Sequence, residues 1–180
     1  LWWKSEYRSR RFLYKTVMPY RRWENEECFI SDKKITSGRN TYIRRVSVWS
    51  NFYPRRNQST AERDHQRTWV ADFGEKKDDI CYVAEISGKI AGAIWCRIMD
   101  DYGHVNEDTP SLAISVLEEF RRCGIGTALM QQMLTALKQQ GYPQVSLSVQ
   151  KANYAARMYE KLGFEIVEDK EEEYIMVHRL

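Results

Sequence analysis

The sequence predicts a mixed α/β (α+β) fold in which helices pack on a single sheet. Between residues 80 and 180, apolar runs rich in β-forming residues alternate with amphipathic helical segments, which is the pattern of a sheet covered by helices. The chain of 180 residues has the length of one compact domain. Its 43% hydrophobic and 29% charged residues exclude disorder as its overall state.

Charge divides the chain into two parts. Residues 1–60 hold 14 Lys and Arg against 5 Asp and Glu, whereas residues 61–180 hold 14 against 20. Aromatic residues are also concentrated at the start, with 12 of the 23 in the first 60 residues. We therefore divide the chain into a basic, aromatic N-terminal extension, residues 1–40, and a folded domain, residues 41–180.

The extension leaves two interpretations open. Its alternating Arg and Trp or Tyr residues suit single-stranded RNA or an anionic membrane, and they equally suit a terminal segment that docks on the acidic remainder. No RNP, KH or zinc-finger pattern accompanies the charges, so nucleic acid is not expected as a partner. The spacing of Leu13, Val17 and Tyr20 favours a helix here.

The elements of the folded domain follow from hydrophobic periodicity and turn residues. Residues 41–48 are predicted as a first strand, and residues 60–73 as a helix that ends near Gly74. The dipeptide Ser87-Gly88 joins two β-rich runs into a hairpin. Further strands are expected at 111–117 and 144–150, helices from 125 to Gly141 and at 153–162, and two final strands on either side of the acidic turn 170–173.

The most informative segment is residues 116–130, where a strand runs into Arg-Arg-Cys-Gly-Ile-Gly and directly into an amphipathic helix. Gly124 and Gly126 permit a positive φ and have no Cβ, so successive backbone N–H groups can converge on one anion. The helix N-terminus adds donors and a partial positive charge. Arg121 and Arg122 supply full charges suited to bidentate phosphate contacts. The segment therefore predicts a turn that binds a diphosphate.

Spacing excludes several other kinds of site. The turn lacks the Gly-Lys-Ser/Thr ending of a Walker A loop and the Gly-x-Gly-x-x-Gly of dinucleotide-binding folds. Cys28, Cys81, Cys96 and Cys123 form no zinc-binding spacing, so we expect no metal, and reduced thiols in a cytoplasmic protein. No apolar run approaches the roughly 18 residues of a membrane span, so no membrane partner is expected.

Two motifs in the expected order resemble the GNAT superfamily of acetyltransferases. Residues 114–126, which read Ile-Ser-Val on a strand and then Arg-x-x-Gly-x-Gly before a helix, look like the acetyl-CoA motif of this family. Residues 153–164 resemble its Asn…Ala…Tyr…Gly-Phe helix. The resemblance is clear over residues 80–180, weaker over 41–79 and absent from 1–40.

The resemblance implies a mostly antiparallel sheet that splays between its fourth and fifth strands, counted from residue 41. Pantetheine would enter the gap as an extra strand and pair with backbone groups of Ile114 and Val116. The acetyl-CoA contacts implied in this way are Ile114, Ser115, Val116, Arg121, Arg122, Cys123, Gly124, Ile125, Gly126, Thr127 and Asn153.

The resemblance also implies a general acid. Tyr159 matches the family position at which a phenol protonates the departing CoA thiolate, and an unperturbed phenol pKa of about 10 keeps the donor protonated at neutral pH. The alternative is a core tyrosine beside Leu162 and Phe164. Asn153 precedes Tyr159 by six residues, whereas the corresponding residues are seven apart in many relatives. The resemblance therefore supports a CoA contact by Asn153 less than it supports the role of Tyr159.

The general base is not marked by any motif. Ribosomal-protein N-terminal acetyltransferases place a Glu on the strand that here reads QVSLSVQ, and this chain has no acid there. In the acidic loop 100–110, His104 is a candidate base, with a solvated loop residue as the alternative and a water chain as a further candidate. Cys123 faces the pyrophosphate rather than the thioester in this interpretation, which argues against a ping-pong role.

Together these features predict an acyl-CoA-dependent N-acetyltransferase. We expect direct transfer of acetyl from acetyl-CoA to a primary amine of a small molecule or peptide, by a monomer or homodimer. The alternative is a non-catalytic CoA-binding or regulatory module, with the N-terminal extension as a nucleic-acid-binding arm. Turnover on a panel of amines separates the two.

Overall fold

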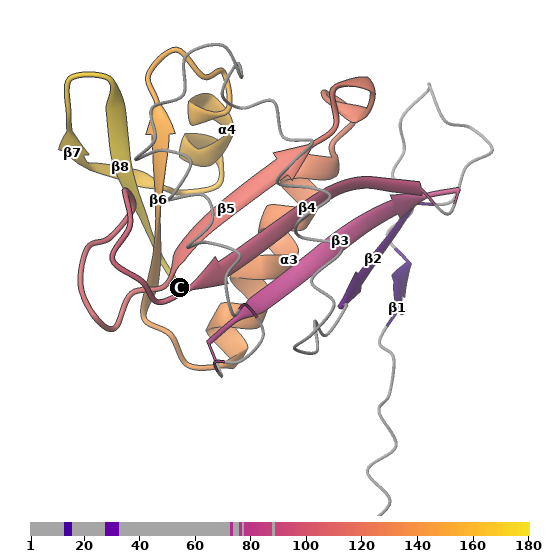
Figure 1. Cartoon of the computed structure of the whole chain (residues 1–180), viewed down its shortest axis with the longest axis horizontal. Coiled ribbons are helices and arrows are strands. Elements are labelled where there is room, and N and C mark those ends of the chain that lie inside the picture. Colours follow the sequence, from indigo (N-terminus) through magenta and orange to yellow (C-terminus); the bar gives the residue numbers. More distant parts are fainter. Residues whose placement is uncertain (1–12, 16–27, 33–72, 74–75, 77, 88) are drawn as a thin grey trace, which may run out of the picture.

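The computed structural model describes residues 13–15, 28–32, 73, 76, 78–87 and 89–180. Within them a single eight-stranded sheet has the order β1-β2-β3-β4-β5-β6-β8-β7 (Figure 1). The elements are β1 Leu13–Lys15, β2 Cys28–Asp32, β3 Ile80–Ile86, β4 Lys89–Arg97, β5 Ser111–Val116, a 3₁₀ turn Glu118–Phe120, α3 Ile125–Gln139, β6 Gln144–Gln150, α4 Ala156–Lys161, β7 Glu165–Asp169 and β8 Glu173–Arg179.

The long helix α3 covers one face of the sheet, against β3, β4 and β5. Its apolar stripe includes Leu129, Met133 and Leu137, all fully buried, and each such side chain contributes about 1.5–3 kcal/mol when it leaves water. From the sheet side, Val145 and Leu147 of β6 enter the same core. The predicted helix and the predicted strand 144–150 are confirmed.

The opposite face of the sheet has its own smaller apolar cluster, formed by Phe73, Cys81, Val83, Ala93 and Trp95. At its margin Arg97 forms a buried ion pair with Asp79, with Nε 3.0 Å from Oδ1. Because a buried charge needs a hydrogen-bonded partner, this pair fixes the start of β3 against the end of β4. The two faces therefore bury different sets of side chains.

The sheet is split between β5 and β6. These strands run parallel, yet in the described part of the chain they share a single register pair, Ser111 with Ser146, and Figure 1 shows them diverging from that point. The amide of Ser146 donates to the carbonyl of Pro110 at 3.0 Å and closes this end. The splay predicted between strands 111–117 and 144–150 is confirmed.

The first half of the chain differs from expectation where it is described. Leu13 lies in strand β1, which pairs with β2, and β2 in turn pairs with β3, so the helix favoured by residue spacing is wrong at Leu13. The strand is stabilised by pairing with β2, and the spacing of apolar residues in the sequence does not reveal such pairing with another segment. The predicted strand 41–48 lies outside the described residues, as does helix 60–73 apart from Phe73. The boundary at residue 40 stays a prediction.

Two further sequence predictions concern a hairpin turn and a helix. The Ser87-Gly88 hairpin is confirmed, with Ser87 at a φ of 49° and β3 paired antiparallel to β4. The helix predicted at 153–162 is shorter, because α4 begins at Ala156. Among the described helices, none is both long and apolar enough to cross a bilayer.

Candidate active site

The open edge of β5 is the first part of the candidate site. Leu117 donates its N–H to Ala91 of β4 at 2.9 Å, whereas the carbonyl of Pro110 faces β6. Since backbone groups alternate in direction along a strand, even-numbered residues of β5 face β6. Ile114 and Val116 therefore present their backbone N–H and C=O groups to the gap, as expected for pairing with an extended ligand.

The turn after β5 supplies the second part. Arg122 and Gly124 both have a positive φ, 59° and 79°, and Gly124 stands at the N-cap of α3, where no side chain of the described residues caps the helix. The amides of the first turn have no partner within the helix, and they carry the positive end of its dipole. This arrangement can bind an anion.

The two glycines of the turn have different roles. Only Gly124 uses the left-handed conformation, whereas Gly126 is a helical residue of α3. A Cβ on Gly126 would stand 3.5 Å from Sδ of Met158 and 3.9 Å from Cγ2 of Val116. Gly126 thus keeps open the space between the helix, the strand and α4.

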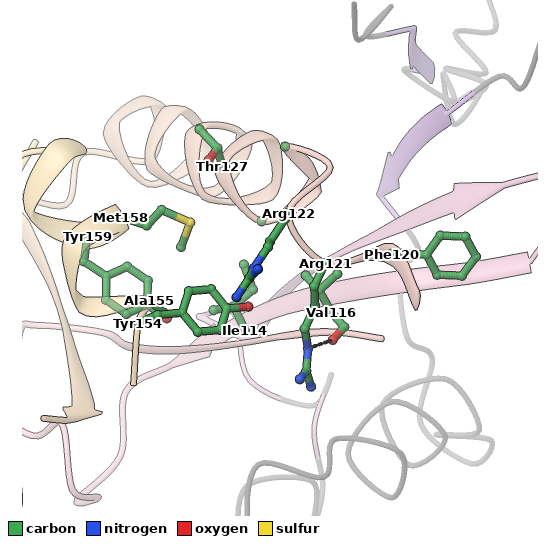
Figure 2. Close-up of a pocket in the computed structure, with 12 residues that line it drawn as sticks. Ile114, Val116, Phe120, Arg121, Arg122, Thr127, Tyr154, Ala155, Met158 and Tyr159 are labelled. Carbon is green, nitrogen blue, oxygen red and sulfur yellow. Dashed lines mark hydrogen bonds between the residues drawn. The ribbon is translucent and has the colours of Figure 1, made fainter. Parts of the chain in front are cut away.

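A pocket lies where β5, the start of α3 and the α4 segment meet (Figure 2). Its walls are apolar at the strand and polar at the turn, so it can take a ligand with one slender arm and one anionic end. The residues that line it are Ile114, Val116, Phe120, Arg121, Arg122, Gly124, Gly126, Thr127, Tyr154, Ala155, Met158 and Tyr159.

Tyr159 is the ionisable side chain buried in this pocket. It is 6% exposed, and its ring centre lies 5.9 Å from that of Phe164. Burial is the main cause that raises the pKa of Tyr159 above its ordinary range, and the nearby Tyr154 adds to it. Its hydroxyl makes no hydrogen bond within the described ranges. A neutral phenol in this position can donate a proton to a group that enters the pocket.

The two arginines of the turn point in different directions. Arg121 donates from Nε to the carbonyl of Val116 at 3.1 Å. The guanidinium of Arg122 is exposed and lies 5.8 Å from the ring centre of Tyr154, and Figure 2 shows it reaching across the mouth of the pocket. Both arginines line the pocket, and their positive charges suit a phosphate-bearing ligand.

Three of the predicted contact residues have side chains outside the pocket. Cys123 and Ile125 are buried in the core, and the thiol of Cys123 donates to the carbonyl of Arg121 at 3.3 Å. Ser115 is buried on the sheet face opposite α3. The parts of Cys123 and Ile125 that remain for a ligand are their backbone amides, and a ligand role for Ser115 stays a prediction.

Asn153 and His104 do not line the pocket either. The Oδ1 of Asn153 accepts a hydrogen bond from the amide of Ala155 at 3.0 Å, so this side chain orders the start of α4. Nδ1 of His104 lies 3.2 Å from the carbonyl of Met99, which makes Nδ1 the donor and leaves Nε2 to accept. Their roles toward CoA and as a base stay predictions.

Sequence reasoning missed four lining residues: Phe120, Tyr154, Ala155 and Met158. A helical signal was present for Ala155, which precedes Tyr159 by four residues, because side chains four apart are neighbours on a helix. Tyr154 and Ala155 lie just before α4, which begins at Ala156. The spacing therefore identifies only part of this wall.

The comparisons with known proteins agree with this geometry. The family described as "Acetyltransferase (GNAT) family" matches residues 43–164. The chain belongs to the GNAT acetyltransferase family. The enzyme class predicted from the sequence, an N-acetyltransferase with an amine acceptor of some kind, is thereby confirmed.

Two relatives of this GNAT chain have been named for their activity. The N-alpha-acetyltransferase of Sulfurisphaera tokodaii is 38% identical over 112 residues, 53% of this chain and 66% of that protein. The N-alpha-acetyltransferase of Sulfolobus acidocaldarius is 31% identical over 137 residues, 67% of this chain and 80% of that protein.

Solved structures show the same GNAT fold. PaiA N-acetyltransferase from Thermoplasma acidophilum, in complex with coenzyme A, aligns with a TM-score of 0.63 at 16% identity, over 84% of this chain and 99% of that one. The ribosomal-protein-S18-alanine N-acetyltransferase from Escherichia coli aligns with a TM-score of 0.61 at 18% identity, over 83% and 93%. The predicted fold class is confirmed.

Proposed function

We propose that this GNAT enzyme transfers the acetyl group of acetyl-CoA directly to the α-amino group of a peptide. The acetyl-CoA part rests on one observation: the open edge of β5, the uncapped start of α3 and the buried Tyr159 meet in a single pocket. The α-amino part rests on the two N-alpha-acetyltransferases at 38% and 31% identity.

The pocket offers each part of acetyl-CoA a chemically matched partner. The diphosphate fits the amides and charges of the turn from Arg121 to Thr127, where Gly124 and Gly126 allow close approach. The amides of pantetheine match the outward-facing backbone groups of Ile114 and Val116. The thioester would then lie beside Tyr159, at the inner end of the pocket.

In the proposed reaction, the amine nitrogen attacks the thioester carbonyl carbon. A C–N bond forms, the C–S bond breaks, and Tyr159 donates its proton to the departing thiolate. A backbone N–H of the open β5 edge would stabilise the negative charge that develops on the carbonyl oxygen, a kind of contribution worth about 3 kcal/mol. The raised pKa of Tyr159 keeps this donor in its neutral form.

A panel of acceptors tests the proposal. Purified protein and acetyl-CoA are incubated with peptides that have a free N-terminus, with the same peptides blocked at the N-terminus but carrying a lysine, and with polyamines, amino acids and aminoglycosides. We expect CoA release and a gain of one acetyl group on the free N-terminal peptides. Transfer only to lysine or to small amines would overturn the α-amino assignment, and acetyl-CoA binding without transfer to any amine would overturn the reaction.

A further inference from the structure

The strand β6 carries polar side chains on the face of the sheet opposite α3, and one of them is Ser148. Val145, Leu147 and Val149 point into the core beneath α3, so the intervening Ser146, Ser148 and Gln150 face the other way. On the neighbouring strand β8, Glu173 is in register with Gln150 and therefore shares that face. The hydroxyl of Ser148 donates to Oε2 of Glu173.

This contact places a carboxylate beside strand β6, which has no acidic residue of its own. The strand QVSLSVQ has no acidic residue of its own, and pairing with β8 brings Glu173 onto it. The side chain of Glu173 is 21% exposed, and its Oε1 lies 3.8 Å from Nζ of Lys170. A carboxylate has about four acceptor positions, so contacts with Ser148 and Lys170 leave capacity for another donor.

The Ser148–Glu173 pair lies at the place where the sheet splits. The last register pair joins Ser111 and Ser146, and Ser148 is the next residue of β6 on the same face. Beyond that pair β5 and β6 separate (Figure 1), and Ile114 and Val116 on the open edge of β5 line the pocket. A group bound on this face at the split would meet the thioester from the side opposite α3.

Two buried polar atoms on the same face lack partners. Oγ of Ser115 on β5 and Nε1 of Trp95 on β4 have no hydrogen-bond partner among the described residues, and the two residues are 2% and 6% exposed. Trp95 is in register with Ala113, which places both on the side that carries Ser148. An unsatisfied buried polar group costs about 1–3 kcal/mol, so these two atoms mark a polar interior on this side of the sheet.

We propose that Glu173, held by Ser148, is the general base that takes the proton of the acceptor amine. The inference rests on the proposed function, because it names the acceptor side of the same reaction. A carboxylate here also attracts the cationic ammonium form of the acceptor. It thus serves both to bind the acceptor and to convert it to the nucleophilic amine.

The proton balance is complete without a further reactant. The ammonium gives one proton to Glu173, and the resulting neutral amine attacks the thioester carbon. The nitrogen loses a second proton as the amide forms, and this proton restores the phenol of Tyr159, which has given its own proton to the thiolate. Glu173 returns its proton to water after the products leave.

Glu173→Gln is the direct test, with Glu171→Gln as the matched control, because Glu171 is an exposed residue of the turn just before β8. The probes are acetyl-CoA and the amine that the wild-type protein acetylates fastest. We expect Glu173→Gln to lower kcat/KM about 100-fold, with acetyl-CoA affinity by calorimetry and the melting temperature unchanged. Glu173→Asp should recover part of the rate, and Ser148→Ala should lose less than Glu173→Gln.

A pH profile separates a base from a structural residue. Without a base, transfer depends on acceptor that is already neutral, so the kcat/KM of Glu173→Gln should rise steadily toward the pKa of the amine and approach the wild-type value there. The ion pairs beside Glu173 are those of Lys170 with Glu168 and with Glu173 itself, and the Lys151–Asp169 pair at the neighbouring strand ends. The residues of these pairs other than Glu173 remain in all the variants.

The outcomes are distinguishable. If the wild-type protein acetylates an amine and Glu173→Gln has the same kcat/KM and the same pH profile, the role of Glu173 is overturned and the proposed function stands. Wild-type protein that binds acetyl-CoA but acetylates no amine would overturn the proposed function and this inference with it.

Discussion

Strands β5 and β6 have a closed end, at which they are hydrogen-bonded, and an open end a few residues further along, at which they are apart. The closed end holds the Ser111–Ser146 pair and the bond from Ser146 to Pro110. The open end exposes backbone groups of Ile114 and Val116 to a pocket. The comparison teaches that, in this sheet, the closed end fixes the angle at which β5 and β6 diverge and so leaves the backbone groups of the open end facing a pocket.

The loop 100–110 explains why the closed end stays closed. Asp101 accepts from the amide of Gly103 at 3.1 Å and from the hydroxyl of Ser111 at 3.0 Å. Gly103 lies so close to the strands that an added Cβ would stand 2.5 Å from Oγ of Ser111 and 3.1 Å from the amide of Ser148. The loop thus fastens the first residues of β5 against β6.

The largest effect is expected at the open end, from Tyr159→Phe. Removing the hydroxyl removes the proposed proton donor while the ring still packs on Phe164. We expect kcat to fall about 100-fold with no change in acetyl-CoA affinity, measured by steady-state kinetics and calorimetry. Tyr142→Phe, at a half-buried tyrosine bonded to Asp78, is the control for loss of a hydroxyl elsewhere.

The pH dependence sharpens the same prediction. Because burial raises the pKa of Tyr159, its neutral, donating form persists to a higher pH than that of a free phenol. The kcat of the wild-type protein should therefore show no loss from ionisation of this residue up to about pH 10. An unchanged kcat in Tyr159→Phe would remove Tyr159 from the mechanism.

Gly103→Ala is expected to have the next largest effect, and it acts on the closed end. The new methyl group would overlap Ser111 and press on the backbone of β6. Overpacking of this kind costs about 1–3 kcal/mol, to be measured as the loss in free energy of unfolding in urea. Glu107→Ala, at an exposed position of the same loop, should change stability little. Equal stability of the two variants would show that the loop does not hold the strands together.

Gly126→Ala is expected to have the smallest effect. It acts at the open end, where it should weaken CoA binding without lowering the stability of the fold. Alanine is a better helix former than glycine by up to about 1 kcal/mol, and its Cβ would make only ordinary contacts, so stability should be equal or higher. Its methyl group narrows the space next to the uncapped amides, and we expect CoA to bind about tenfold more weakly, a loss of about 1.4 kcal/mol. Thr135→Ala on the exposed side of α3 should not alter CoA affinity.

The proposed cofactor side of the site was predictable because it depends on local sequence. Gly124 must occupy a left-handed conformation directly before a helix, and the strand, turn and helix are consecutive in the chain. The periodicity of β6 was equally clear, since Val, Leu and Val alternate with Ser, Ser and Gln. Such signals need no knowledge of which strands are neighbours.

The proposed acceptor side was not predictable, because it depends on which strands are neighbours. Ser148 and Glu173 are 25 residues apart, and their contact exists only because β8 pairs with β6. Asn153 shows another limit, since its Oδ1 accepts a hydrogen bond from the amide of Ala155 that the sequence did not predict, while its contact with CoA stays a prediction. Asx residues compete for nearby backbone donors, and a family pattern does not reveal which donor is chosen.

The outer strand β7 has a consequence for aggregation. It interrupts its register with β8 between Ile166 and Glu168 and carries Glu165, Glu168 and Asp169 on exposed positions. Irregular register and like charges each oppose recruitment of another strand. Despite exposed Ile166 and Val167, this margin of the sheet is therefore a poor template for edge-to-edge aggregation.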